Sequence, residues 1–253
     1  MLKKSMPFLD HLEELRKRIL ISLLAIIIVT SVALIFSNAI LKVLLIPAGG
    51  MKLNAFSLMD GFMIKFRIAL YIGIAMAFPI WGFELYRFIS PGLHDNERRS
   101  LLPGLLASTV LFILGVLFGY YLLREMIKVM IALFPPEVAF LPAADDYISF
   151  VTFFLVACGV AFQLPVVLTI LVQLRILSAT ILRKQRRIAY FALFVFAEIA
   201  TPVTDPIIAP LVVMVPLVLL YEASILVAVR IEAGRLNNSK SQITIGSDKP
   251  GNV

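Results

Sequence analysis

The chain has few of the residues from which enzymes commonly build reactive sites. Its 253 residues include one cysteine, Cys158, and two histidines, His11 and His94. A single cysteine excludes a disulfide framework, and no Cys/His cluster has the spacing of a metal site. The Gly-x-x-x-x-Gly-Lys-Ser/Thr pattern of a phosphate-binding loop is absent too. We therefore predict no metal, no cofactor and no enzymatic activity.

Charge is also scarce. Charged residues make up 15% of the chain and hydrophobic residues 60%, with a mean hydropathy of +0.97. Soluble domains are nearer a quarter charged, so this composition indicates a protein with several membrane spans. The formal net charge of +7 does not predict nucleic-acid binding, because most Lys and Arg residues lie in short patches between apolar runs.

The apolar residues fall into six runs, and a helix needs about 20 residues to cross ~30 Å of hydrocarbon. The runs are approximately 19–41, 62–89, 101–123, 147–174, 188–200 and 207–229. We predict an all-α fold with six transmembrane helices, in which the fifth is short. The membrane domain is expected to span residues 1–233, and the polar residues 234–253 are expected to form a disordered tail.

Four of the prolines inside these runs are expected to affect the helices. Pro79 and Pro165 lie within the two longest runs, where we expect a kink in each helix. Pro210 and Pro216 are expected to break the first half of the sixth run. In the third run, Gly115-x-x-x-Gly119 permits the close approach of a neighbouring helix.

The distribution of Lys and Arg predicts the orientation of the spans. These residues concentrate before the first run, in the second and fourth connections and after the sixth run. By the positive-inside rule, both termini are cytoplasmic. Lys65 and Arg67 are exceptions near the outer end of the second run, and we expect their side chains to extend to the outer interface.

Ionisable residues inside the spans are candidates for function. Glu84 is either functional or paired with Arg87, one turn away. Glu198 stands in the short fifth run, and Glu222 either forms an interhelical hydrogen bond or has a functional role.

Two further polar residues near the spans also have two interpretations. Asp205 is expected to cap the start of the sixth helix, which leaves a functional role open. Gln163 either binds carbonyls freed by Pro165 or contacts a ligand.

Acidic residues also stand in two cytoplasmic segments. If residues 8–18 are helical, Glu14 lies four residues before Arg18, and the two either pair with each other or await a cationic partner. In the second connection, Glu97 precedes two arginines. Two carboxylates on one face of the membrane are what a pair of guanidinium groups requires, because Arg–carboxylate hydrogen bonds are bidentate and charge-assisted.

Five sequence blocks carry a further signal. They are His11-Leu12-x-Glu14-Leu15-Arg16-x-Arg18, Phe88-Ile89-x-Pro91-x-Leu93 with Glu97-Arg98-Arg99, Phe162-x-x-Pro165, Thr201-Pro202 with Asp205-Pro206, and Tyr221-Glu222. In order and spacing, these blocks resemble the TatC family of the twin-arginine, or Sec-independent, protein translocase. The resemblance covers about residues 7–230.

The resemblance implies a concave bundle of six helices, with short helices five and six, in a bacterial-type cytoplasmic (inner) membrane. It implies a receptor for the twin-arginine signal peptides of folded cargo, in which Glu14 and Glu97 contact the arginines. Arg16, Phe88 and Pro91 belong to the same implied site. Transport in the family is driven by the proton-motive force.

The family's partners are single-span TatA/TatB-type subunits, which dock along helices five and six, and further copies of TatC. The polar residues that match or neighbour this region are Gln163, Glu198, Thr201, Thr204, Asp205 and Glu222. Many members carry Glu at the place of Gln163, and a glutamine cannot titrate. Many also have a polar Ser/Thr-Gln pair where Ile208 and Ala209 stand here.

The sequence leaves two alternative functions open. A small-solute secondary transporter would couple through Glu84, Glu198 and Glu222, although the chain lacks inverted repeats. An intramembrane enzyme is less favoured, because no nucleophile and base can be paired within the spans.

Overall fold

The computed structural model describes residues 8–89, 101–132, 135, 142–201 and 208–247. Within these residues the regular secondary structure is helical, apart from one β-bridge between Asn54 and Ala143. The elements are α1 (Phe8–Ile35), α2 (Ser37–Leu45), the 3-10 helix η1 (Ile46–Ala48), α3 (Asp60–Met76), α4 (Phe78–Ile89), α6 (Leu101–Ala132), α7 (Ala144–Ala161), α8 (Leu164–Gln173), α9 (Ala179–Lys184), α10 (Arg186–Ala200) and α11 (Ile208–Ser247).

Several of these helices are long and apolar enough to cross a membrane. Four spans qualify alone, over residues 10–35, 104–132, 144–173 and 210–234, and the bent pair α3 and α4 makes a fifth. The helix α10 has only 15 residues and corresponds to the short fifth run. The sixth helix is not short, because α11 has 40 residues and continues well past its apolar part.

The prolines act as predicted in two spans and differently in the third. The chain bends by 48° between α3 and α4, just before Pro79. A second break separates α7 from α8, and Pro165 lies in the first turn of α8. By contrast, α11 runs through Pro216 without a break, so that prediction is wrong. Pro210 falls in the first turn of α11, where an N–H needs no helical partner, and Pro216 removes a single backbone hydrogen bond.

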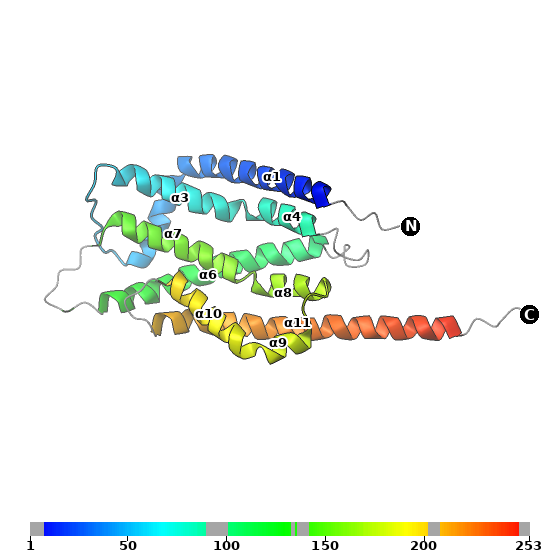
Figure 1. The fold of residues 1–253 in the computed structure, drawn as a ribbon. Helices are drawn as coiled ribbons and strands as arrows, with labels where there is room; N and C mark the ends of the chain where they lie inside the picture. Colours follow the sequence, from blue (N-terminus) through cyan, green and yellow to red (C-terminus); the bar gives the residue numbers. More distant parts are fainter. Residues whose placement is uncertain (1–7, 90–100, 133–134, 136–141, 202–207, 248–253) are drawn as a thin grey trace, which may run out of the picture.

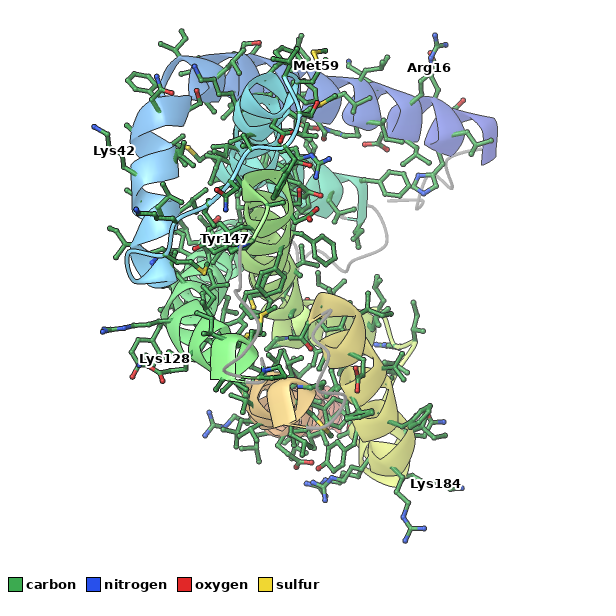
Figure 2. All side chains as sticks on the ribbon, turned by 90° about the vertical axis from the view of Figure 1, so that its left-hand side faces the viewer. Arg16, Lys42, Met59, Lys128, Tyr147 and Lys184 are labelled. Carbon is green, nitrogen blue, oxygen red and sulfur yellow. The ribbon has the colours of Figure 1, made fainter. Side chains whose placement is uncertain are left out.

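The first run also differs from its prediction. The span ends at Ile35 rather than residue 41, and α2 then crosses the end of the bundle, where Figure 2 labels Lys42. Ser37 and Asn38, which follow the break, are weak helix formers because their side chains compete for backbone hydrogen bonds. The new direction is stabilised by Tyr147 of α7, which donates a 2.8 Å hydrogen bond to the carbonyl of Leu44.

Residues 234–247 depart from the predicted disordered tail. They form the last turns of α11. No proline occurs between Pro216 and Pro250, so nothing stops the hydrogen-bond ladder of the span from continuing beyond the membrane. Residues 248–253 lie outside the described part of the chain.

Glycines set the closest helix contacts. A Cβ atom on Gly73 of α3 would lie 2.1 Å from Oγ1 of Thr30 and 2.8 Å from its Cα, so α1 and α3 touch nearly backbone to backbone. A Cβ on Gly115 would lie 2.6 Å from the carbonyl oxygen of Cys158, and one on Gly119 would lie 3.0 Å from its Sγ. The predicted close approach at Gly115 and Gly119 is therefore confirmed, with α7 as the neighbour.

The long helices lie side by side, and α1 begins and α11 ends at the same end of the bundle (Figure 1). Viewed from the end, α1 and α10 lie at opposite extremes of a curved arrangement, with α3 and α7 between them (Figure 2). Large apolar side chains such as Leu24, Ile27 and Ile28 of α1 are exposed, as expected for a face in contact with lipid.

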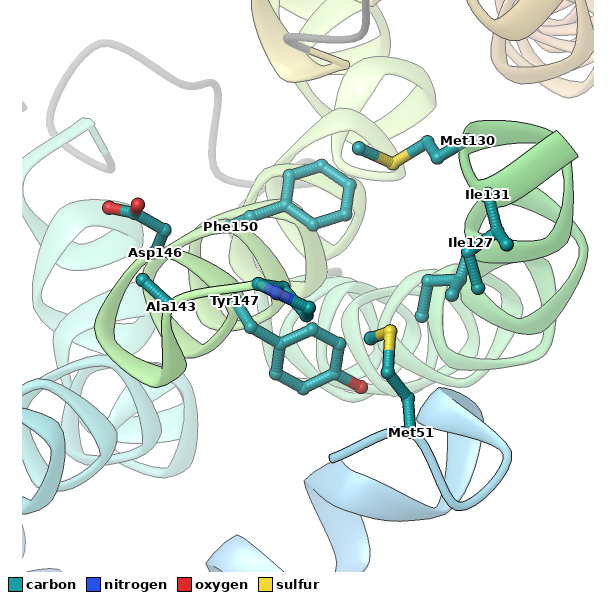
Figure 3. Close-up of a pocket in the computed structure, with 9 residues that line it drawn as sticks. Met51, Ile127, Met130, Ile131, Ala143, Asp146, Tyr147 and Phe150 are labelled. Carbon is teal, nitrogen blue, oxygen red and sulfur yellow. The ribbon is translucent and has the colours of Figure 1, made fainter. Parts of the chain in front are cut away.

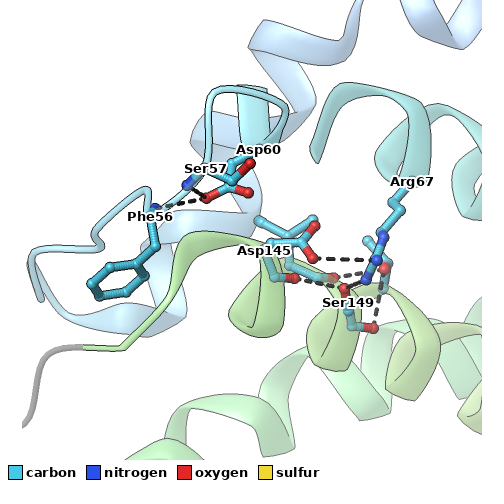
Figure 4. Close-up of polar contacts among 8 residues, drawn as sticks. Phe56, Ser57, Asp60, Arg67, Asp145 and Ser149 are labelled. Carbon is cyan, nitrogen blue, oxygen red and sulfur yellow. Dashed lines mark hydrogen bonds and ion pairs between the residues drawn. The ribbon is translucent and has the colours of Figure 1, made fainter. Parts of the chain in front are cut away.

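At the end of the bundle opposite the start of α1, polar contacts join α3 to α7 (Figure 4). Arg67 pairs with Asp145 at 3.2 Å and also donates to the hydroxyl of Ser149. The pair with Asp145 was not predicted, because its acceptor comes from the neighbouring span. Asp60 accepts hydrogen bonds of 2.8 and 3.0 Å from the amides of Phe56 and Ser57, which orders the start of α3.

The turn after α8 yields a stability prediction. Arg175 has φ of 60°, a left-handed conformation that costs an L-residue roughly 1 kcal/mol and that glycine adopts freely. We expect Arg175→Gly to raise the free energy of unfolding by up to about 1 kcal/mol, measured by thermal unfolding in detergent. The matched control is Arg183→Gly within α9, which should lower it by about as much. Equal losses in both variants would contradict the prediction.

Candidate functional site

The central feature of the site is an arginine shared by two carboxylates from different helices. Nη2 of Arg18 lies 2.8 Å from Oε1 of Glu14 on the same helix, and Nη1 lies 2.7 Å from Oε2 of Glu84 on α4. The predicted Glu14–Arg18 pair is confirmed. The predicted Glu84–Arg87 pair is wrong, since Glu84 is buried and turned to Arg18 whereas Arg87 is exposed.

These side chains are largely removed from solvent. The exposed fractions are 13% for Arg18, 19% for Glu14 and 9% for Glu84. Charges in such surroundings interact more strongly than surface charges, and losing one partner leaves another unpaired. We call the three residues the Arg18 cluster.

Beside the cluster, His11 of α1 stacks on Phe88 of α4, with ring centroids 4.4 Å apart and an interplanar angle of 11°. This contact brings one predicted site residue, Phe88, next to the helix that carries Glu14. Arg16 is exposed and points away from the bundle (Figure 2). It is therefore not part of the cluster.

Two apolar hollows adjoin the cluster and share Trp81 and Leu85 of α4. The first, of about 320 Å³, lies between α1 and α4 and is lined by Arg18, Glu84 and Phe88 together with apolar residues. The second, of about 480 Å³, lies between α4, α6 and α8. Both hollows are lined almost wholly by apolar side chains, and the first also by the charged residues Arg18 and Glu84.

Gln163 lies at the second hollow. Its side chain accepts a 2.6 Å hydrogen bond from the hydroxyl of Ser108 and donates a 3.1 Å bond to the Ser108 carbonyl. Gln163 therefore links the break between α7 and α8 to α6, rather than binding carbonyls freed by Pro165. Both polar groups of its amide are engaged.

The polar residues of the last two spans have different surroundings. Glu222 accepts 2.6 Å hydrogen bonds from Arg186 and from Tyr190, so the predicted interhelical bond is confirmed. Thr201 is buried and donates to the carbonyl of Ala197 within its own helix. Glu198 is half-buried on α10, and its carboxylate forms no hydrogen bond with another described residue.

Four of the predicted site residues, Pro91, Glu97, Thr204 and Asp205, lie outside the described residues. The structure therefore places Glu14 and Phe88 close together, and it places Gln163, Glu198 and Glu222 elsewhere in the bundle. Within the described part of the chain, no group of three or more His, Cys, Asp and Glu side chains is arranged to hold a metal ion.

A separate cavity of about 310 Å³ lies at the opposite end of the bundle, among Met51, Met130, Tyr147 and Phe150 (Figure 3). Its lining is mainly apolar, and Asp146 points away from its centre (Figure 3). It offers no charged group for recognition of a ligand.

Sequence analysis missed the role of Arg18 and Glu84 as a pair. The sequence shows only that the two residues have opposite charges and belong to different spans. Which turns of α1 and α4 face each other depends on helix packing, and a sequence does not give that alignment.

The fold and the cluster define a multi-pass α-helical membrane protein with a charged site beside an apolar concave surface. Residues 10–216 match the family model described as Sec-independent protein translocase protein (TatC). The chain is 35% identical to the Sec-independent protein translocase protein TatC of Carboxydothermus hydrogenoformans, over 89% of this chain and 93% of that one. It is 34% identical to TatCy of Bacillus subtilis, over 88% and 89%.

A solved structure described as the twin arginine translocase receptor TatC in DDM superposes with a TM-score of 0.78 at 32% identity, covering 86% of this chain and 99% of that one. The chain belongs to the TatC family of Sec-independent protein translocases. The predicted six-helix TatC fold is thus confirmed, and these relatives are translocase components rather than enzymes. The matches give no support to a small-solute transporter.

Proposed function

We propose that the chain is the receptor subunit of a twin-arginine translocase, and that it binds the signal peptides of folded cargo at the ends of α1 and α4. The observation that best supports this proposal concerns the carboxylate of Glu14. It lies close to an apolar hollow, and its Oε2 atom is buried and has no hydrogen-bond partner among the described residues. A signal peptide offers the complement, guanidinium groups followed by an apolar stretch. Glu97 is the second proposed acceptor, on the sequence pattern alone.

In this proposal the chain lies in a bacterial-type inner membrane with both termini in the cytoplasm. The positions of Lys and Arg support that orientation. The start of α1 and the end of α11 at one end of the bundle are consistent with it (Figure 1). Phe88 and Pro91 are proposed to flank the bound arginines, and Arg16 to lie at the rim of the site.

We also propose that single-span TatA/TatB-type subunits pack against α10 and α11, that further copies of the chain assemble with it, and that the proton-motive force drives transport. Glu198 is an acidic residue on α10 that forms no hydrogen bond with another described residue, which supports a contact with a partner helix. Gln163 at the second hollow is another candidate. Thr201, Thr204, Asp205 and Glu222 remain candidates by sequence pattern.

Binding of a labelled twin-arginine signal peptide to the purified chain in detergent tests the receptor function. We expect Glu14→Gln and Glu97→Gln each to weaken binding at least about tenfold, because each removes a charge-assisted hydrogen bond. A peptide with two lysines in place of the arginines should bind more weakly to the wild type, since lysine cannot make bidentate contacts.

The matched control is Glu13→Gln, which changes an exposed carboxylate next to Glu14. It should leave the affinity within about twofold. If the double variant Glu14→Gln/Glu97→Gln binds the peptide as tightly as the wild type, the assignment of the site is wrong.

A further inference from the structure

The Arg18 cluster carries one more negative charge than positive charge. Two carboxylates, Glu14 and Glu84, face a single guanidinium, at 2.8 and 2.7 Å. All three side chains are at least four-fifths buried. Excess charge in such a place is costly, so the cluster is complementary to one more cation.

The unused hydrogen-bonding atoms point to the same conclusion. Oε2 of Glu14 and Nε of Arg18 are both buried and have no partner among the described residues. Buried polar atoms are nearly always paired, so an orphaned carboxylate oxygen indicates a contact that is made in another state. The ionised carboxylate of Glu14 can accept a hydrogen bond at Oε2 but cannot donate one. A partner that donates a hydrogen bond and carries a positive charge would therefore satisfy both requirements.

We propose that Arg18 stands in for a ligand guanidinium at Glu14, and that Glu84 is the acceptor that retains Arg18 when a ligand arginine takes its place. This inference rests on the proposed function of Glu14 and adds two residues to the site. Glu84 acts through Arg18 and is therefore a positioning residue.

The exchange follows from the geometry. Because Oε2 of Glu14 is buried, an incoming guanidinium reaches this carboxylate only as Arg18 gives up its bond to Oε1. Arg18 keeps its bond to Glu84, so no buried charge is left without a partner. Without Glu84, Arg18 would have Glu14 as its only acceptor among these residues, and a ligand arginine would have to strand a buried cation to bind.

The charges before and after the exchange support this sequence. The ligand-free cluster has a net charge of −1, and the cluster with one bound arginine is neutral. Each carboxylate then has one guanidinium. The apolar hollow of about 320 Å³ next to Arg18 and Glu84 would receive apolar residues that accompany the arginine.

The test is a double-mutant cycle on binding of the labelled twin-arginine peptide to the purified full chain. Glu84→Gln should weaken binding about tenfold. Arg18→Gln should bind at least as tightly as the wild type. The double variant Arg18→Gln/Glu84→Gln should return to within about threefold of the wild type, because the internal competitor is gone.

Glu125→Gln, which removes the exposed Glu125–Lys128 pair on α6, is the matched control and should not change affinity. A purely structural role for Glu84 predicts that the double variant stays as weak as Glu84→Gln, and that result would overturn the inference. So would weak binding by Arg18→Gln, which can be judged even where Glu84→Gln fails to fold.

Glu14→Gln in the same assay separates the two proposals. If Glu14→Gln has no effect, the proposed function of the site fails. If Glu14→Gln weakens binding and Glu84→Gln does not, only the exchange at Arg18 is wrong.

Discussion

Replacing Gly73 with valine is expected to separate α1 from α3 and to leave little folded protein. Even one Cβ atom at this position would lie 2.1 Å from Oγ1 of Thr30 and 2.8 Å from its Cα. A backbone atom cannot move aside as the end of a flexible side chain can, so the helices must shift apart. We expect a loss of about 3 kcal/mol or more, at the upper end of the cost of overpacking. Size-exclusion profile and thermal unfolding in detergent measure it.

The contact between Thr30 and Gly73 bears on function because it sets how α1 and α3–α4 align. The helix α1 and the pair α3–α4 run in opposite directions. Arg18 precedes Thr30 by nearly as many residues as Glu84 follows Gly73. Fixing one contact therefore brings Arg18 to Glu84. Residual folded Gly73→Val protein should accordingly bind signal peptide weakly.

Gly234→Val is the control for this prediction, because nothing lies within 4 Å of a Cβ atom at Gly234 on α11. It should leave stability unchanged or slightly raised, since valine is the better helix former. A Gly73→Val protein that is monodisperse and unfolds at the wild-type temperature would show that α1 and α3 are not in close contact.

Replacing Asp145 with leucine is expected to destabilise the protein by about 2 kcal/mol. The change leaves Arg67 of α3 charged inside a span without its carboxylate partner (Figure 4). Arg67 is 37% exposed and Asp145 is 24% exposed, so water and lipid headgroups reduce the cost below that of a fully buried pair. Thermal unfolding in detergent is the measurement.

The double variant Arg67→Met/Asp145→Leu should recover at least half of that loss. Removing both charges replaces an ion pair with apolar side chains of similar length, which suits a membrane interior. As a control, Glu125→Leu breaks an exposed pair with Lys128 and should change stability by less than about 0.5 kcal/mol. A double variant that loses as much as the sum of the two single variants would argue against the pair.

Local sequence features predicted the parts of the fold that depend on neighbouring residues in the chain. Pro79 and Pro165 fixed the positions of two helix breaks, because proline removes a backbone donor wherever it stands. Glu14 and Arg18 pair because a spacing of four residues places them on one helical face. The prediction for Pro216 was wrong because a single lost hydrogen bond does not end a helix when the residues around the proline are apolar.

The same reasoning could not find contacts between spans. For Glu84 the sequence offered only Arg87 as a partner, because it is close in the chain, yet the partner is Arg18, 66 positions away. The sequence also indicated no partner for Arg67, which pairs with Asp145 of α7. The turn into α2 was missed because no proline or glycine marks it, and Tyr147 of α7 holds the new direction.

By itself, then, the sequence determined that this is an all-α membrane protein with six spans, and the five motif blocks predicted its TatC family. Hydrophobic length and charge distribution are properties of the chain and need no neighbours. Only the tertiary structure decided that Glu14, Arg18 and Glu84 form one cluster with an unused carboxylate oxygen. The alignment of two antiparallel helices depends on which small side chains let their backbones meet, and here the meeting point is Gly73 against Thr30.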